Sequence, residues 1–249
     1  MPIYYLRGDF VKESIISIIL TTVFLFTILI IDKTRSVSTD NILYTDTPVI
    51  IIDAGHGGED GGAVVQENIV EKDINLAIAQ KTNEILSLFG FNTYMVRETD
   101  KLIYDSDSKT QRQKKNSDLR NRLNIMNNYD NCIYISIHQN KFEDSRIWGA
   151  QTFYSPNDEH SPILAEFIQS SIVELTQPTN KRVIKKTGTN VFVIYNATKP
   201  AIMVECGFMS NNNELAKLKD DKYQKQMSFA ISNGILNYYI SEVKYGSEV

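Results

Sequence analysis

Two of the chain's three histidines come directly after strongly apolar segments. His56 lies in a glycine-rich turn behind the apolar residues 49–52, and His138 ends the β-branched and aromatic segment 132–137. Active groups of α/β sheets lie beyond the carboxyl ends of the strands, so two histidines at equivalent strand ends indicate a shared metal site. The third histidine, His160, lies in a polar turn that opens a helix, where we expect a solvated side chain.

Two glutamates are the candidates to complete such a site. Catalytic zinc usually takes three protein ligands and keeps a fourth position for water, so a third ligand is needed. Glu71 opens an amphipathic helix predicted at 71–88, although the helix dipole alone also favours an acid in the first turn. Glu205 ends the buried strand predicted at 201–205, where a charge without a partner is costly.

Other kinds of site are less consistent with the sequence. The glycine-rich turn at 55–62 lacks the ending of a nucleotide P-loop and does not fit Gly-x-Gly-x-x-Gly. Ser136 lies near His138, but no Gly-x-Ser-x-Gly elbow surrounds it. The only two cysteines, Cys132 and Cys206, fall in or beside predicted core strands, where cysteine behaves as a small apolar residue. These patterns favour metal-dependent hydrolysis over phosphate binding or serine chemistry.

Four motifs, in this order along the chain, closely resemble those of the zinc-dependent N-acetylmuramoyl-L-alanine amidases. They are Asp53-Ala54-Gly55-His56-Gly57-Gly58, Glu71 with Asn75-Leu76-Ala77, Ser136-Ile137-His138-Gln139-Asn140, and Val204-Glu205-Cys206-Gly207-Phe208-Met209-Ser210-Asn211. Arg97 with Asp100, and Arg122 with Asn127, resemble the connecting motifs of that family. The resemblance extends over roughly residues 48 to 240.

The resemblance implies a Zn2+ enzyme that hydrolyses the amide between N-acetylmuramic acid and L-alanine in peptidoglycan. It implies that His56, Glu71 and His138 ligate zinc and that Glu205 is the catalytic carboxylate, which takes a proton from water and returns it to the departing amine. No organic cofactor is expected. Asp53 either accepts a hydrogen bond from a zinc histidine or simply closes the turn.

A narrower resemblance is to the germination-specific amidases of endospore-forming bacteria. It implies removal of stem peptides from the spore cortex for muramic-δ-lactam formation, in the forespore intermembrane space facing the cortex. An exposed site with three ligands, in a chain without a wall-binding module, also suggests an accessory activator protein. The alternative is a catalytically weak or inactive pseudoenzyme of the same fold that binds peptidoglycan or a partner. An intact Glu205 favours catalysis.

The amino terminus predicts a membrane location. Residues 1–13 read as a cytoplasmic N-terminus, and residues 14–31 contain no charge, as expected of a transmembrane anchor or uncleaved signal. The polar residues 32–47 read as a linker to a catalytic domain at 48–245, which we place outside the cytoplasm. The formal net charge of −4 argues against general nucleic-acid binding.

The elements that must position these residues alternate along the chain. Strands are predicted at 49–53, 91–96, 132–137, 149–154, 191–195 and 201–205, and helices near 71–88, 118–129, 159–175 and 221–240. This alternation predicts one α/β catalytic domain with a three-layer mixed β-sheet of about six strands flanked by helices.

Three other segments carry open interpretations. The polar segment 98–117 is predicted to be a long loop, either functional or mobile. The basic cluster at 181–186 either meets stem-peptide carboxylates or is a solvated loop face. Trp148, Phe153 and Tyr154 either stack on sugars or belong to the core.

Overall fold

The computed structural model describes residues 47–66 and 68–245. The N-terminal segment predicted at 1–13, the membrane segment at 14–31 and nearly all of the linker at 32–47 lie outside these residues, so they stay predictions. Within the described ranges, no helix is both long and apolar enough to cross a bilayer. The catalytic part belongs to one compact unit that begins at Asp46.

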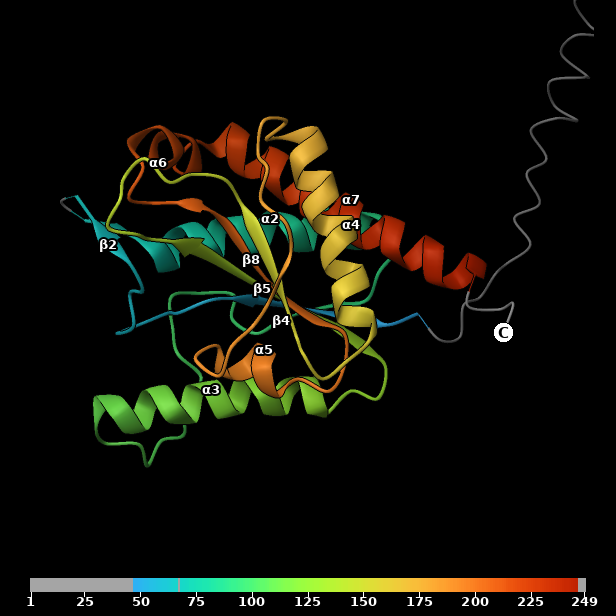
Figure 1. Ribbon diagram of the computed structural model, residues 1–249. Coiled ribbons are helices and arrows are strands. Elements are labelled where there is room, and N and C mark those ends of the chain that lie inside the picture. Colours follow the sequence, from blue (N-terminus) through green and yellow to red (C-terminus); the bar gives the residue numbers. More distant parts are fainter. Residues whose placement is uncertain (1–46, 67, 246–249) are drawn as a thin grey trace, which may run out of the picture. The chain divides into compact units, whose positions relative to one another are not determined.

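Six strands form a mixed sheet in the order β4-β1-β5-β8-β6-β7 (Figure 1). Their bounds are β1 Val49–Ala54, β4 Thr93–Met95, β5 Cys132–Asn140, β6 Gln151–Tyr154, β7 Lys185–Lys186 and β8 Ala201–Phe208. The strands β4, β1, β5 and β8 are parallel to one another, whereas β6 runs antiparallel to β8 and pairs with β7 in parallel. The predicted mixed sheet of about six strands is therefore confirmed. A separate hairpin joins β2 Val64–Val65 to β3 Ile69–Val70.

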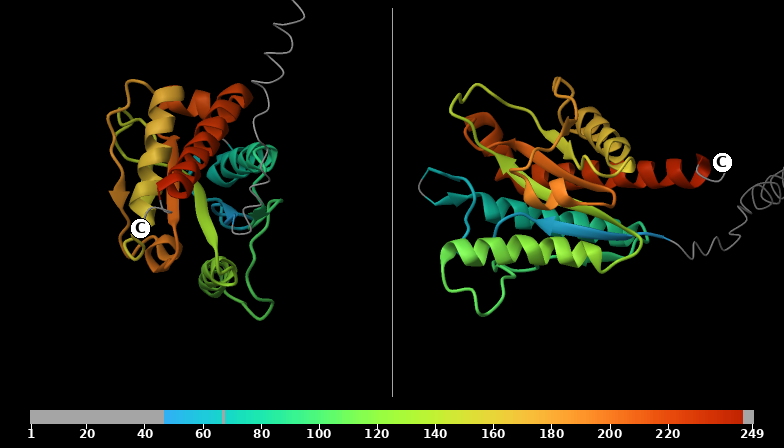
Figure 2. Two further views of the ribbon diagram at one scale, coloured as in Figure 1. Left: turned by 90° about the vertical axis from the view of Figure 1, so that its right-hand side faces the viewer. Right: turned by 60° about the horizontal axis from the view of Figure 1, so that its bottom comes forward.

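Helices cover both faces of the sheet, which gives the predicted three layers (Figures 1 and 2). On one face lie α2 Glu71–Leu88, α4 His160–Leu175 and α7 Asp221–Tyr245. On the other lie α3 Gln111–Asn127 and the short α5 Phe192–Asn196, while α6 Asn212–Leu218 follows β8. The side chains of β1 alternate between the two cores: Ile50 and Ile52 pack in one cluster and Ile51 in the other. This two-sided burial explains why the strand is a continuous apolar run.

The predicted strand at 191–195 is wrong, because this segment forms α5. A short run of β-branched and aromatic residues does not distinguish a strand from a buried helical turn. Only Val193 and Ile194 of α5 are buried, on the side that contacts the core.

The predicted loop at 98–117 is wrong in its last part, because α3 begins at Gln111 rather than near 118. The Thr110 side chain accepts a hydrogen bond from the Gln113 backbone, and the Gln113 side chain accepts one from the Thr110 backbone. This capping box stabilises a helix start that is polar and therefore shows no apolar periodicity. The short elements β2, β3, β7 and α6 were also not predicted.

Strand register determines which functional residues meet. Because β1, β5 and β8 are parallel, their carboxyl ends lie at one edge of the sheet. Asp53 pairs with Ser136 across β1 and β5, and His138 pairs with Glu205 across β5 and β8. His138 and Glu205 therefore lie side by side at this edge of the sheet.

Candidate metal centre

The three predicted ligands come together at the carboxyl edge of the sheet. One ligand atom each from His56, Glu71 and His138 lie within 4.8 Å of one another. Nδ1 of His138 lies 2.9 Å from Oε1 of Glu71, and Nε2 of His56 lies 3.4 Å from Oε2 of the same carboxylate. Two imidazole nitrogens and a carboxylate are a common ligand set for catalytic zinc, so the residues present suit this metal.

The turn that carries His56 needs its glycines. His56 itself has φ 62° and Gly57 has φ 141°, both in the left-handed region that favours glycine. A Cβ at Gly57 would lie 2.5 Å from the carbonyl oxygen of Lys101. A Cβ at Gly55 would lie 2.1 Å from Nε2 of His138, so only glycine lets that ring pack against the turn.

Two buried arginines donate hydrogen bonds to the backbone of the same turn. Arg97, which is 1% exposed, donates to the carbonyl oxygens of Ala54 at 2.8 Å and Gly55 at 3.1 Å. Arg122 donates to the carbonyl oxygen of His56 at 3.0 Å. These bonds satisfy carbonyl groups that a tight turn cannot pair with itself, and they fix the position of the His56 backbone.

Among the described residues Asp53 bonds neither a zinc-ligand histidine nor the backbone of the turn, so it neither orients a histidine nor closes the turn itself; it acts on the turn through Arg122. Its carboxylate pairs with Arg122, which also bonds Asp118 through Nε at 2.7 Å. Burial is the largest single influence and works to raise the pKa of Asp53, but the charges of Arg122 and His138 and the hydrogen bonds from Tyr134 and Ser136 together hold the pKa below its usual value. Ser136 donates its hydroxyl proton to Asp53 at 2.9 Å. The Ser136 hydroxyl is thus hydrogen-bonded within the buried group formed by Asp53, Arg122 and Asp118.

The residue that orients His56 is Asp60, which sequence reasoning missed. Oδ2 of Asp60 lies 3.0 Å from Nδ1 of His56, and Nζ of Lys115 lies 3.3 Å from the same oxygen. This contact leaves Nε2 of His56 facing Glu71. Burial lowers the pKa of His56, yet hydrogen bonds and charges from Asp60 and Glu71 raise it to about 9. The only sequence signal was a carboxylate four residues after the histidine.

Glu71 is fixed by several donors. The backbone of Ala63 donates to Oε2 at 2.8 Å, and the backbone of Gln139 donates to Oε1 at 3.1 Å. Burial tends to raise the pKa of Glu71, but His138 and His56 lower it well below its usual value. The side chain is therefore an anion at neutral pH, as a metal ligand must be.

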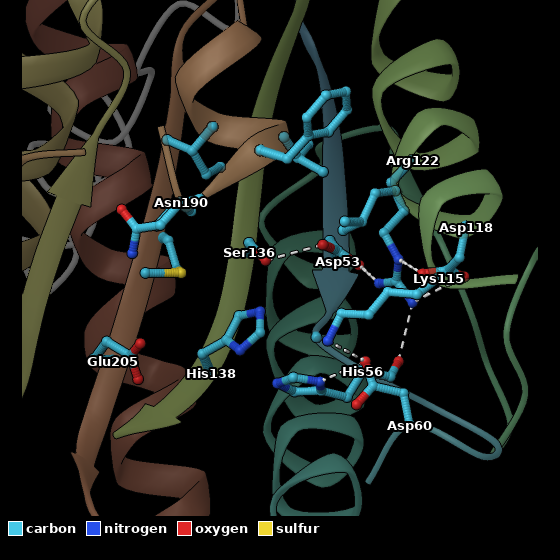
Figure 3. Close-up of a pocket in the computed structure, with 17 residues that line it drawn as sticks. Asp53, His56, Asp60, Lys115, Asp118, Arg122, Ser136, His138, Asn190 and Glu205 are labelled. Carbon is cyan, nitrogen blue, oxygen red and sulfur yellow. Dashed lines mark hydrogen bonds and ion pairs between the residues drawn. The ribbon is translucent and has the colours of Figure 1, made fainter. Parts of the chain in front are cut away.

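Glu205 faces this group from the adjacent strand β8 (Figure 3). Its Oε2 atom is buried and has no hydrogen-bond partner among the residues that the structure describes. Burial is the largest influence and raises the pKa of Glu205 to about 7. A buried carboxylate without a partner, poised to take or release a proton near neutral pH, has the properties of a general base.

A cavity of about 260 Å³ connects these groups with the α3 and α5 side of the sheet. His56, His138 and Glu205 line it, and Figure 3 shows them with Asn190, which was not singled out from the sequence. The apolar residues that line the cavity are Leu119, Val191, Phe192, Val193, Ile194 and Met203. The segment mistaken for a strand therefore forms a wall of the cavity. His160 pairs instead with Glu242 and does not line this cavity.

Comparisons with known proteins concern the chain as a whole. Residues 50–237 match the family model Amidase_3, described as N-acetylmuramoyl-L-alanine amidase. The chain is 34% identical over 191 residues to the germination-specific N-acetylmuramoyl-L-alanine amidase of Bacillus subtilis, which covers 77% of this chain and 79% of that relative.

Solved structures of amidases are also similar to this chain. The CwlD amidase from Clostridioides difficile, solved in complex with the GerS lipoprotein, is 38% identical with a TM-score of 0.75. The match covers 78% of this chain and 99% of that one. An N-acetylmuramoyl-L-alanine amidase from Clostridium difficile 630 is 30% identical with a TM-score of 0.69, covering 79% of this chain and 99% of that one.

Proposed function

The chain belongs to the Amidase_3 family of N-acetylmuramoyl-L-alanine amidases, and on that premise we propose that it is a zinc enzyme that removes stem peptides from spore-cortex peptidoglycan. The bond cleaved, between N-acetylmuramic acid and L-alanine, follows from the family. The observation that carries the proposal is the convergence of His56, Glu71 and His138 beside the unpartnered carboxylate of Glu205.

We assign the metal ligands to His56, Glu71 and His138. A zinc ion held by them supplies a Lewis acid that polarises the amide carbonyl and makes water more acidic. Asp60 accepts the Nδ1 proton of His56 and so keeps Nε2 free to bind, which is the usual way in which a ligand histidine is oriented. Backbone donors on both oxygens of Glu71 restrict that side chain in the same way.

Glu205 moves the proton in this scheme. It accepts a proton from the attacking water and delivers it to the amine of the departing L-alanine. In the metal-free chain its pKa is about 7, so neither gaining nor losing a proton at this carboxyl is strongly unfavourable at neutral pH, as the two steps require. The helix α5 contributes apolar side chains to the wall of the same cavity.

The cortex assignment draws on the relatives. One of them is named a germination-specific amidase, and one structural neighbour is CwlD. We propose that the stripped muramic acid is then converted to muramic-δ-lactam, and that the chain acts outside the cytoplasm, in the forespore intermembrane space. The membrane anchor at 14–31 belongs to this proposal as a prediction.

An accessory protein is a further part of the proposal. The CwlD structure was solved in complex with the GerS lipoprotein, and the ligand histidines proposed here are 19% and 20% exposed at their side chains. We propose that a partner of this kind assists the present chain. Full activity and stoichiometric zinc binding of the chain alone would contradict this part.

The test of the activity uses purified cortex peptidoglycan. The full-length chain is incubated with zinc, and mass spectrometry detects newly freed L-alanine amino termini. The wild type should release stems, whereas the matched Glu205→Gln variant should not. Equal release by both would contradict the role of Glu205, and no release by a folded, zinc-loaded wild type supplied with its accessory protein would contradict the activity.

The cortex role has its own test. Spores that lack this chain should contain no muramic-δ-lactam, measured by digestion of their cortex and chromatography of the fragments. A normal δ-lactam content would contradict the spore role and leave the amidase activity intact.

A further inference from the structure

A second cleft, of about 310 Å³, lies near the carboxyl edge of the sheet and shares no residue with the cavity beside Glu205. Trp148 forms one part of its lining. The others are residues 176–179, directly after α4, and Asn211, Asn213, Glu214 and Lys217 at and within α6. Figure 1 places α6 at the end of the molecule toward which β5 and β8 point.

Trp148 is exposed although its backbone is firmly held. The side chain is 42% exposed, and the residue precedes β6 rather than lying in the core strand. Arg182 donates through Nε to the Trp148 carbonyl oxygen at 2.8 Å, and the Gly149 backbone donates to the buried Glu214 at 3.0 Å. Gly149 has φ 98°, a conformation suited to glycine. The backbone around Trp148 is therefore fixed by hydrogen bonds, while its indole ring is exposed to solvent and does not pack in the core.

The cleft also offers polar groups that the fold does not use. Within the part of the chain that the structure describes, the side chains of Asn213 and Thr179 make no hydrogen bond. The side chain of Asn211, in contrast, caps α6 and donates to the carbonyl oxygen of Ser145, which fixes the α6 wall to the loop before Trp148. An aromatic face beside a free amide and a free hydroxyl suits a sugar ring. The apolar face of the ring stacks on indole, and its hydroxyl and acetamido groups bond to the polar side chains.

The register of β6 and β8 fixes how far this cleft is from the reacting groups along the strand direction. Gln151 of β6 pairs with Glu205 of β8, and the strands are antiparallel. Trp148 therefore lies three positions beyond Glu205, toward the carboxyl end of β8, at roughly 3.3 Å per residue or about 10 Å. This offset is measured along the strands alone: the cleft lies on the α4 and α6 side of the sheet and the cavity beside Glu205 on the α3 and α5 side, so a glycan strand bound at both must pass over the carboxyl edge.

We propose that this cleft is a glycan subsite, in which Trp148 and Asn213 bind an N-acetylated sugar of the same peptidoglycan strand as the muramic acid that is cleaved. The inference rests on the proposed function for the identity of the polymer. It makes the enzyme prefer long glycan strands to single muramoyl peptides.

The chain itself provides a direct binding signal, because Trp148 is its only tryptophan. The full-length protein is titrated with the tetramer of N-acetylglucosamine while tryptophan emission is recorded, and the glucose tetramer, which has no acetamido group, is the matched control ligand. A saturable shift to shorter wavelength with the first sugar alone is expected. Asn213→Ala should weaken this titration about tenfold, and Phe229→Ala, an exposed aromatic on α7, should leave it unchanged. No saturable shift, or an equal response to both sugars, overturns the proposal.

Measurements of hydrolysis distinguish an error in the proposed glycan subsite from an error in the proposed amidase function. In Trp148→Ala, the ratio of kcat/KM on long glycan strands to kcat/KM on muramoyl dipeptide should fall about tenfold, which is about 1.4 kcal/mol. An unchanged ratio overturns the subsite, whereas cleavage of the dipeptide by the wild type still supports the amidase. A saturable tryptophan shift without any hydrolysis supports the subsite and contradicts the amidase function.

Discussion

Replacing Glu205 with glutamine should stabilise the metal-free chain above neutral pH. Burial raises the pKa of Glu205 from 4.5 to about 7, so the folded chain binds this proton more tightly than the unfolded chain does. The cost of ionising Glu205 is absent below pH 4.5, grows between the two pKa values and is complete above pH 7. Glutamine cannot ionise, so the variant avoids this cost.

The size of the effect follows from the two pKa values. Their difference, at about 1.4 kcal/mol per pH unit, corresponds to about 3 kcal/mol of unfolding free energy. For a domain of this size, that amounts to roughly 6–12 °C in Tm. A carboxylate kept unpaired for catalysis would thus cost stability, as residues at active sites often do.

Urea unfolding in the presence of a chelator measures this prediction. The difference in unfolding free energy between Glu205→Gln and the wild type is followed from acidic pH to above pH 7. Glu166→Gln, on the exposed face of α4, is the matched control for the change in chemistry. If the difference between Glu205→Gln and the wild type stays constant across this range, the reasoning about a buried, unpaired carboxylate is refuted.

Three further changes test the rest of the site. Asp60→Ala should lower zinc affinity about 10–100-fold, because His56 loses the acceptor that orients it; competition with a chelating dye measures this, and unchanged affinity would exclude the orienting role. Arg122→Met should lower the unfolding free energy by about 3–5 kcal/mol, because it leaves two buried carboxylates without their cation. Denaturant unfolding measures this change, and a decrease of less than about 1 kcal/mol would contradict the prediction. Gly149→Ala should destabilise by more than about 1 kcal/mol, since its φ is 98° and a Cβ would meet Asn180 at 2.7 Å; an unchanged unfolding midpoint would show that the turn adapts.

The proximity of the principal site residues could be predicted from the sequence because it depends on strand ends. His56 follows the apolar strand β1, His138 and Glu205 lie near the carboxyl ends of β5 and β8, and the carboxyl ends of these parallel strands lie at one edge. Glu71 could be placed because it opens a helix shortly after the His56 turn.

The remaining features depend on contacts that no local pattern reveals. Asp60 lies in an irregular turn, and its contact with His56 depends on a backbone conformation with positive φ. The opening of α3 is polar, so the capping box at Thr110 and Gln113 was its only signal. Residues 191–195 have the composition of a strand but form a helical wall, because the sheet is completed by β6 and β7 instead.

The central claim is that three residues bind zinc and a fourth moves the proton. It is tested most directly by measuring zinc content and muramoyl-L-alanine hydrolysis on the same preparations of wild type, Glu205→Gln and His56→Ala. With the accessory protein supplied to every preparation, we predict one zinc per chain with full turnover for the wild type, retained zinc without turnover for Glu205→Gln, and loss of both for His56→Ala. Turnover by Glu205→Gln, or full zinc content in His56→Ala, would contradict the account.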